Sequence, residues 1–192
     1  MLKNLSQKNL ILGSGSPRRA NLLREMQLDF EIRVIPTEED FSTELLPFEI
    51  AEYLAKKKSN AFLKELKTDD VVITADTIVS YNDKILNKPQ NLQEAKLMLE
   101  NLSGTKHEVI TGVAILSNKK QIVFHSSTQV TFSILNGNEI DFYLNHFEAM
   151  DKAGAYGIQD WIGIIGVKEI KGSYYNVVGL PTNALYNHLK EF

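Results

Sequence analysis

Residues 71–79, Val-Val-Ile-Thr-Ala-Asp-Thr-Ile-Val, are the stretch from which the fold is most readily predicted. Their β-favouring side chains predict an extended strand. Because alternate side chains of a strand share a face, Asp76 lies with Thr74 on one face, and Thr77 lies on the other. A carboxylate within this run is locally unfavourable, so a buried Asp76 must be paired, hydrogen-bonded or bound to a metal. The alternative is an exposed aspartate on a half-solvated face of the sheet.

Predicted strands and helices interleave along the rest of the chain without strict alternation. Strands are predicted at residues 9–12, 30–35, 84–86, 108–116 and 121–134, and short strands over the glycine-rich residues 154–179. Helices are predicted to begin at Ser16, to cover residues 47–66, 91–102 and 139–147, and to end the chain after Pro181. This order predicts an α/β fold with a mixed sheet flanked by helices. A length of 192 residues fits one large domain, or two small lobes that share a core.

Composition excludes several classes of protein and site. The 21 Lys and Arg residues against 24 Asp and Glu residues give a net charge of −3, which disfavours a nucleic-acid-binding module. The absence of cysteine excludes disulfides, zinc–thiolate sites, iron–sulfur clusters and thiol nucleophiles. No apolar run approaches the roughly 18 residues of a membrane span, and residues 1–15 do not resemble a secretory signal. We therefore expect a cytoplasmic protein with no membrane or nucleic-acid partner.

The first candidate for chemistry is the stretch Gly-Ser-Gly-Ser-Pro-Arg-Arg at residues 13–19. A strand ends there, and a helix begins with Ser16 as its cap and Pro17 at its first position. Helix N-termini bind anions, and the guanidinium groups of Arg18 and Arg19 suit phosphate oxygens. Cations at the positive end of a helix dipole are disfavoured unless an anion or acidic partner is present. The alternative is a well-capped helix with two solvated arginines.

Two lysines are further candidates for binding an anion. Lys58 lies in the middle of the apolar stripe of the helix predicted at residues 47–66, where it either snorkels to solvent or reaches inward to an anion. Lys88 precedes Pro89, which holds the segment extended, and its plain alternative is an ordinary turn. With Asp76 and the acidic loop at residues 37–40, these cations suit a polyphosphate substrate and a Mg²⁺-like metal. The residues alone do not separate group transfer, hydrolysis and simple binding of a nucleotide.

Six motifs occur in an order that resembles the Maf family of nucleoside triphosphate pyrophosphatases. They are GSGSPRR (13–19), ADTIV (75–79), NKP (87–89), the LSG, H and TGV pattern (102–113), DKAGAYGIQ (151–159) and GSYYNVVGLP (172–181). The resemblance covers essentially the whole chain. It implies one Maf-like nucleotide pyrophosphatase domain over residues 1–192, with an elongated fold related to the inosine triphosphate pyrophosphatases and a cleft between two lobes. It also implies a cytoplasmic enzyme, often a homodimer, that uses a divalent metal, Mg²⁺ or Mn²⁺.

The resemblance also implies a role for individual residues. Asp76 matches the proton acceptor of the family. Arg18, Thr77 and Gln159 match the positions that mark the branch acting on dTTP and UTP. Residues around the phosphates are matched by Ser16, Arg19, Lys58 and Lys88. Glu38 matches an acidic position near the metal, for which Asp76 is the second candidate ligand.

The resemblance predicts metal-assisted hydrolysis of dTTP and UTP between the α- and β-phosphates. The sequence does not separate two roles for Asp76, deprotonating the attacking water or holding the metal. Gln159 offers a donor and an acceptor that match the O4 and N3–H pattern shared by uracil and thymine. An alternative from a different class is a nucleotide-binding regulator of septum formation that needs no catalysis. The retention of Asp76 and Lys88 favours the enzyme.

Overall fold

The structure is a computed structural model that describes residues 2–192. It confirms the predicted mixed α/β fold, with one seven-stranded sheet of order β2-β1-β3-β5-β6-β7 and β4 paired to β3. The strands are β1 (Asn9–Leu12), β2 (Glu31–Ile32), β3 (Asp70–Tyr81), β4 (Lys84–Leu86), β5 (Lys106–Leu116), β6 (Gln121–Phe132) and β7 (Val167–Lys171). The α-helices are α1 (Pro17–Glu25), α2 (Pro47–Asn60), α3 (Leu92–Leu102), α4 (Gly137–His146), α5 (Trp161–Gly166), α6 (Tyr174–Val178) and α7 (Thr182–Lys190). The short 3₁₀ helices are η1 (Lys3–Leu5), η2 (Ala61–Lys64) and η3 (Ala153–Ala155).

The described chain divides into two compact units. Unit 1 contains residues 2–76, Thr111–Ser126 and Gly179–Phe192, and unit 2 contains Thr77–Ile110 and Ser127–Val178. Within residues 2–192, no helix has both the length and the apolar character needed to cross a membrane.

Unit 1 is built on parallel pairing of β1 with β2 on one side and β3 on the other. The register places Ile11 opposite Val72, and both side chains are buried. They form an apolar cluster with Phe62 of η2 and Leu116 of β5. Strands buried on both faces read as near-continuous apolar runs, and β1 and most of β3 have this character.

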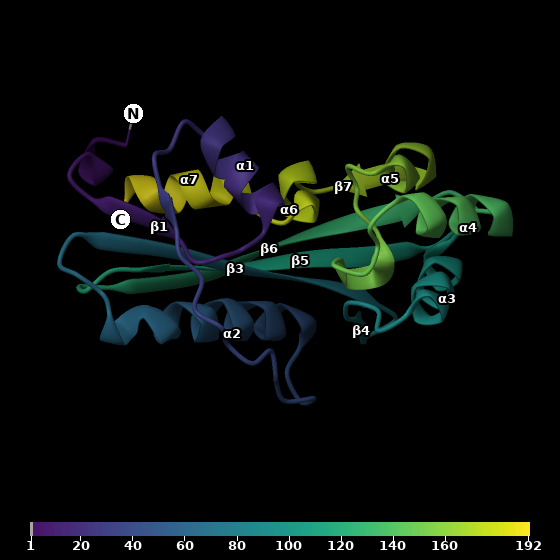
Figure 1. The fold of residues 1–192 in the computed structure, drawn as a ribbon, viewed down its shortest axis with the longest axis horizontal. Coiled ribbons are helices and arrows are strands. Elements are labelled where there is room, and N and C mark those ends of the chain that lie inside the picture. Colours follow the sequence, from purple (N-terminus) through teal and green to yellow (C-terminus); the bar gives the residue numbers. More distant parts are fainter. Residues whose placement is uncertain (1) are drawn as a thin grey trace. The chain divides into compact units, whose positions relative to one another are not determined.

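Helices cover both faces of the sheet in unit 1. Figure 1 shows α2 along one face, and α1 and α7 along the other. The contacts of two successive residues of β6 show that both faces are covered, since neighbouring side chains of a strand point in opposite directions. His125 Nδ1 lies 2.7 Å from Glu52 Oε1 of α2, whereas the ring of Phe124 packs on His188 of α7 with centroids 4.1 Å apart.

The contact between α2 and the sheet is close enough to orient the residues of β3. A Cβ atom on Gly112 would lie 2.1 Å from the carbonyl oxygen of Ala51, so only glycine allows this approach. The hydroxyl of Thr74 donates to the carbonyl oxygen of Ala55 at 2.7 Å. Because Asp76 shares the face of Thr74, its carboxylate also points toward α2. The alternation predicted from the sequence is therefore confirmed.

Unit 2 contains the β3–β4 hairpin and a layer of helices. Asn82 and Asp83 form its turn with φ values of 49° and 60°, which asparagine and aspartate tolerate better than most residues. The side chain of Asn91 caps α3 by accepting from the backbone N–H of Glu94 at 2.9 Å, as the sequence indicates. Helix α3 packs against α4 and η3.

Three predicted elements differ from the structure. The strand predicted at residues 30–35 is only the two-residue β2, and the helix predicted at residues 47–66 leaves α-geometry after Asn60 and continues as η2. The prediction of short strands at residues 154–179 is confirmed only for β7, and it is wrong for the residues that form α5 and α6. The glycines of this segment serve tight packing there; a Cβ atom on Gly163 would lie 2.1 Å from the carbonyl oxygen of Ile158.

The aromatic residues of this segment lie largely outside the core. Tyr174 and Tyr175 are exposed on α6, and Trp161 is half-buried against Phe142 with ring centroids 4.8 Å apart. Tyr143 of α4 and Phe132 of β6 fill the core of unit 2.

Candidate functional site

The loop between β1 and α1 is held by a serine that the sequence analysis did not single out. The hydroxyl of the buried Ser14 accepts from the backbone N–H of Ser16 at 3.3 Å and from Arg19 Nη1 at 3.1 Å. Ser16 is the N-cap residue of α1 and Pro17 is its first residue, as predicted. The Ser16 side chain makes no capping hydrogen bond, so its hydroxyl does not satisfy the start of the helix.

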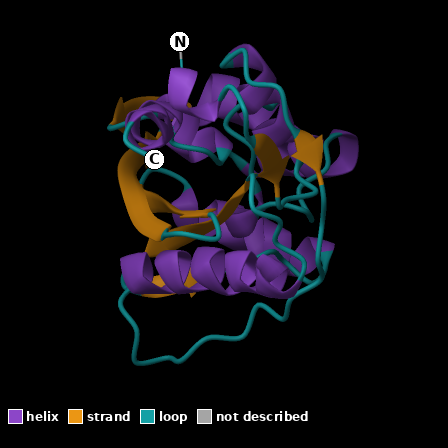
Figure 2. Cartoon of the chain, turned by 90° about the vertical axis from the view of Figure 1, so that its left-hand side faces the viewer, coloured by secondary structure: helices purple, strands orange, loops and turns teal. Residues whose placement is uncertain are grey.

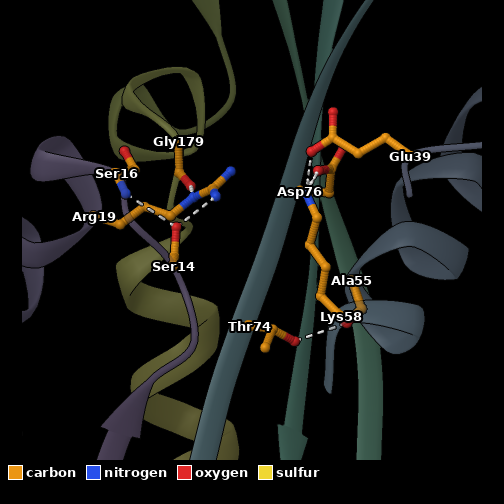
Figure 3. Close-up of polar contacts among 9 residues, drawn as sticks. All are labelled: Ser14, Ser16, Arg19, Glu39, Ala55, Lys58, Thr74, Asp76 and Gly179. Atoms are coloured by element: carbon orange, nitrogen blue, oxygen red, sulfur yellow. Dashed lines mark hydrogen bonds and ion pairs between the residues drawn. The ribbon is translucent and has the colours of Figure 1, made fainter. Parts of the chain in front are cut away.

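Arg19 ties the start of α1 to a distant part of the chain. Its Nε donates to the carbonyl oxygen of Gly179 at 2.9 Å, while Nη1 contacts Ser14 (Figure 3). Burial lowers the pKa of Arg19, Asp76 raises it, and the neighbouring Arg18 lowers it. Guanidinium keeps its proton at neutral pH even when its pKa is lowered. The site therefore contains two fixed positive charges close enough to repel each other.

Asp76 is paired and not solvated. Its side chain is buried in β3 and its Oδ1 accepts a hydrogen bond from Lys58 Nζ of α2. The same ammonium donates to Glu39 Oε1 at 2.7 Å. Figure 3 shows Lys58 and Glu39 meeting at Asp76 beside β3. Of the two alternatives for Lys58, the structure therefore shows the inward one, in which the lysine reaches anionic groups.

The acidic loop is bound to α2 by two neighbouring lysines. Asp40 pairs with Lys57, and this hydrogen bond lowers the pKa of Asp40 and raises the pKa of Lys57. Glu39 pairs with Lys58, and the loop passes below α2 in Figure 2. Glu38, the predicted metal ligand, is exposed and acts electrostatically on Lys57. Glu39 is thus the loop residue that pairs with Lys58, the partner of Asp76. Nothing in the sequence distinguished Glu39 from Glu38.

A divalent metal of the implied kind needs several oxygen donors that converge on one point. Within residues 2–192, no group of three or more His, Asp or Glu side chains is arranged to hold an ion. Two carboxylates, Glu39 and Asp76, do converge on one cation, the ammonium of Lys58. Magnesium is usually held by one or two protein carboxylates, with water and substrate phosphates completing its shell. The residues therefore fit a metal that arrives with a phosphate ligand, and not one bound by the protein alone.

The remaining predicted site residues belong to unit 2. Thr77 is half-buried in β3, directly after Asp76 in the chain. Lys88 is exposed between β4 and α3, next to the buried Pro89. Gln159 is exposed in the turn that precedes α5.

Comparison with known proteins agrees with the order of the motifs. The family model described as "Maf-like protein" matches residues 9–192. The chain belongs to the Maf family.

Two curated relatives of this Maf chain carry the same name. A protein of Christiangramia forsetii named dTTP/UTP pyrophosphatase is 47% identical over 187 residues, which are 97% of this chain and 95% of the relative. A protein of the same name from Parabacteroides distasonis is 46% identical over the whole of both chains. Among solved structures, the Staphylococcus aureus Ham1 protein matches with a TM-score of 0.53 and 17% identity, covering 94% of this chain and 100% of Ham1. This last likeness shows a shared fold.

Proposed function

We propose that this Maf family chain hydrolyses dTTP and UTP between the α- and β-phosphates, giving a nucleoside monophosphate and pyrophosphate with Mg²⁺ or Mn²⁺. The relatives named dTTP/UTP pyrophosphatase support the reaction class and the substrates. The observation that carries the proposal is the cluster of Asp76, Lys58 and Glu39, with Arg19 electrostatically coupled to Asp76. Such a group of opposite charges is costly to assemble unless a charged ligand uses it.

The cations would bind the polyphosphate. Arg18 and Arg19 offer forked donors at the start of α1, and Ser16 adds a hydroxyl that makes no capping bond. Lys58 and Lys88 would add ammonium groups. As pyrophosphate leaves, negative charge builds on its oxygens, and pre-positioned cations stabilise that charge more than they stabilise the substrate.

Asp76 would handle the attacking water. Its Oδ1 accepts from Lys58, and a carboxylate has a second oxygen that can accept a proton or bind a metal. In the hydrolysis, water oxygen bonds to the α-phosphorus, the bond to the bridging oxygen of the β-phosphate breaks, and the water proton passes to a base such as Asp76. A divalent metal, when bound with the nucleotide, would neutralise phosphate charge and acidify a water. Glu39 and Asp76 are the carboxylates that would hold it.

Gln159 and Thr77 would read the base. The amide of Gln159 presents an acceptor and a donor, which complement N3–H and O4 of uracil and thymine. Cytosine reverses the pattern at these two atoms, so a site built on these hydrogen bonds rejects it. Exposure of Gln159 leaves its amide accessible to a ligand.

Hydrolysis of a nucleotide panel tests the proposal. The panel contains dTTP, UTP, CTP, dITP and 7-methyl-GTP, each with Mg²⁺, Mn²⁺ or EDTA, and pyrophosphate and orthophosphate are assayed separately. We expect pyrophosphate from dTTP and UTP, loss of turnover in EDTA, and a loss of about 10³-fold in Asp76→Asn. Orthophosphate as the sole product would show that the wrong bond was assigned. Tight nucleotide binding without any turnover would favour the regulatory alternative.

A further inference from the structure

The turn that carries Gln159 is supported by a buried polar cluster. Asp160 donates its backbone N–H to the carbonyl oxygen of Gly157 at 3.0 Å, which closes residues 157–160 into a turn. We call this the Gln159 turn. Gln159 itself is exposed, whereas Gly157 and Ile158 are buried.

Tyr143 of α4 holds both ends of the Gln159 turn. Its side chain is fully buried, and its hydroxyl donates to Asp160 Oδ2 at 2.8 Å while accepting from the backbone N–H of Gly157 at 3.2 Å. Burial, followed by the nearby Asp160, raises the pKa of Tyr143, so the hydroxyl keeps the proton that it donates. One oxygen atom therefore sets the distance between the first and last residues of the turn.

Lys152 supplies the charge that balances Asp160. Its buried ammonium donates to the carbonyl oxygen of Glu148 and to Asp151 Oδ1 at 2.7 Å, and lies 3.5 Å from Asp160 Oδ2. A buried lysine is rare and is tolerated when acceptors surround it. We call Tyr143, Lys152 and Asp160 the support cluster.

Local rules of helix capping are broken at this place. Asp160 is the N-cap residue of α5, where an aspartate side chain normally accepts from the first turn of the helix. Here its carboxylate makes no capping bond, and Oδ2 faces the support cluster instead. The packing also admits no side chain at Gly157, because a Cβ atom would lie 2.5 Å from Asp160 Oδ2 and 2.9 Å from Lys152 Cε. The side chain of Asp160 thus stabilises the Gln159 turn and not the start of α5. Such exceptions to the local rules are typical of functional positions.

We propose that the support cluster sets base selectivity, because it fixes the Gln159 turn and with it the direction of the Gln159 amide. Tyr143, Lys152 and Asp160 are thus positioning residues that act through Gln159. This inference rests on the proposed function, in which Gln159 reads the base. Two hydrogen bonds to a base edge discriminate only when the amide is held within a narrow range of directions.

The experiment compares kcat/KM for UTP with kcat/KM for CTP in Tyr143→Phe, Gln159→Ala and the double variant. Tyr143→Phe keeps the ring and removes the hydroxyl that both ends of the turn share. We expect it to lower the UTP-to-CTP ratio about tenfold, mainly through KM, and to change nothing further in the Gln159→Ala background. Asp160→Asn, which keeps the shape and removes the charge, should behave alike. Tyr186→Phe on α7 is the matched control and should leave the ratio unchanged.

The outcomes separate this inference from the proposed function. Independent, multiplying effects of Tyr143→Phe and Gln159→Ala would overturn it, as would an unchanged ratio in Tyr143→Phe beside a reduced ratio in Gln159→Ala. In both cases the proposed function stands. An unchanged ratio in Gln159→Ala would instead remove the proposed base reading and this inference with it. Hydrogen exchange gives a readout that needs no activity, because the Gly157 amide should exchange faster in Tyr143→Phe than in wild type.

Discussion

One lysine in each unit lies between two carboxylates, and the two sites differ in how they are assembled. Lys58 of unit 1 joins Asp76 and Glu39, which come from β3 and from the acidic loop. Lys152 of unit 2 finds Asp151 and Asp160 within its own segment, together with a backbone carbonyl group. The first site is made of side chains from three separate parts of unit 1, whereas the second is local and its lysine is buried.

This difference indicates what each lysine can do. The side chain of Lys58 retains 18% exposure and that of Glu39 retains 49%, so a solvated anion or cation can reach the pair and exchange for one partner. The side chain of Lys152 is 9% exposed and has a backbone acceptor that cannot move away. The same charge pattern therefore suits ligand exchange in unit 1 and a fixed conformation in unit 2.

The largest expected effect comes from replacing each lysine by methionine, which has a similar length and no charge. Lys58→Met should lower kcat by about 10²- to 10³-fold, and it should also destabilise the fold, because the side chain of Asp76, which is 12% exposed, loses its cation. Lys152→Met should destabilise the fold by about 2–4 kcal/mol, because Asp160 loses its cation in a mostly buried place. Pyrophosphate release and urea unfolding of both variants measure the contrast. Equal losses of kcat would show that the two lysines have the same role.

His107 of unit 2 provides the next test, because its buried ring should make the stability of the fold depend on pH. Its ring is buried, hydrogen-bonded to Tyr156 at 2.6 Å, and desolvation lowers its pKa to about 4. Unfolded histidine titrates near 6.5, so between pH 4 and 6.5 the unfolded chain binds a proton that the folded chain does not. The free energy of unfolding should therefore rise by about 3 kcal/mol between pH 4 and 6.5 because of this residue. Above this window, His107 should add no further pH dependence.

Urea unfolding of wild type and His107→Gln from pH 7 to pH 4 measures this contribution. Carboxylates titrate in both proteins, so the difference between the two pH profiles isolates His107. We expect a flatter profile in the variant. Parallel profiles would mean that His107 takes up its proton equally well in the folded chain.

Arg18 of unit 1 tests whether a cation there serves activity more than it serves stability. Arg18→Ala should lower kcat/KM for dTTP and UTP by about 10- to 100-fold, because it removes a guanidinium next to the proposed phosphates. Stability should change by less than about 1 kcal/mol, since repulsion with Arg19 is relieved. Arg24→Ala, in the last turn of the same helix, is the control and should leave the kinetics unchanged. Unaltered kinetics in Arg18→Ala would remove Arg18 from the site.

The smallest expected effects concern three successive residues of the acidic loop, whose variants should differ in activity. Glu39→Gln should lower activity about tenfold and weaken the dependence on Mg²⁺ concentration, because Glu39 shares the ammonium of Lys58 with Asp76. Asp40→Asn should have no effect on turnover, since Asp40 pairs with Lys57 instead. Glu38→Gln distinguishes Glu38, the metal ligand implied by the family resemblance, from Glu39, which pairs with Lys58 in the structure. A larger loss of activity in Glu38→Gln than in Glu39→Gln would support the resemblance and place Glu38 at the metal.

Much of the fold could be predicted because its signals are periodic or local. The alternation in residues 71–79 predicted that Asp76 shares a face with Thr74, and the structure shows this. Ser16 and Pro17 marked the start of α1, and Asn91 the start of α3. Residues 154–179, apart from β7, were misassigned because glycine-rich packing overrides local propensity, so that Gly163 allows α5 to pack closely on Ile158.

The sequence by itself determined the family, through motifs whose order needs no folding to be read, and the faces of β3 and α2, through their periods of 2 and 3.6 residues. Only the tertiary structure decided which groups meet. Lys58 reaches Asp76, Glu39 reaches Lys58 where Glu38 was expected, and Arg19 reaches Gly179 across 160 residues of chain. The reason is physical. Direction along a helix or strand repeats with a fixed period, whereas a loop has none, and a long-range ion pair depends on the packing of every element between its partners.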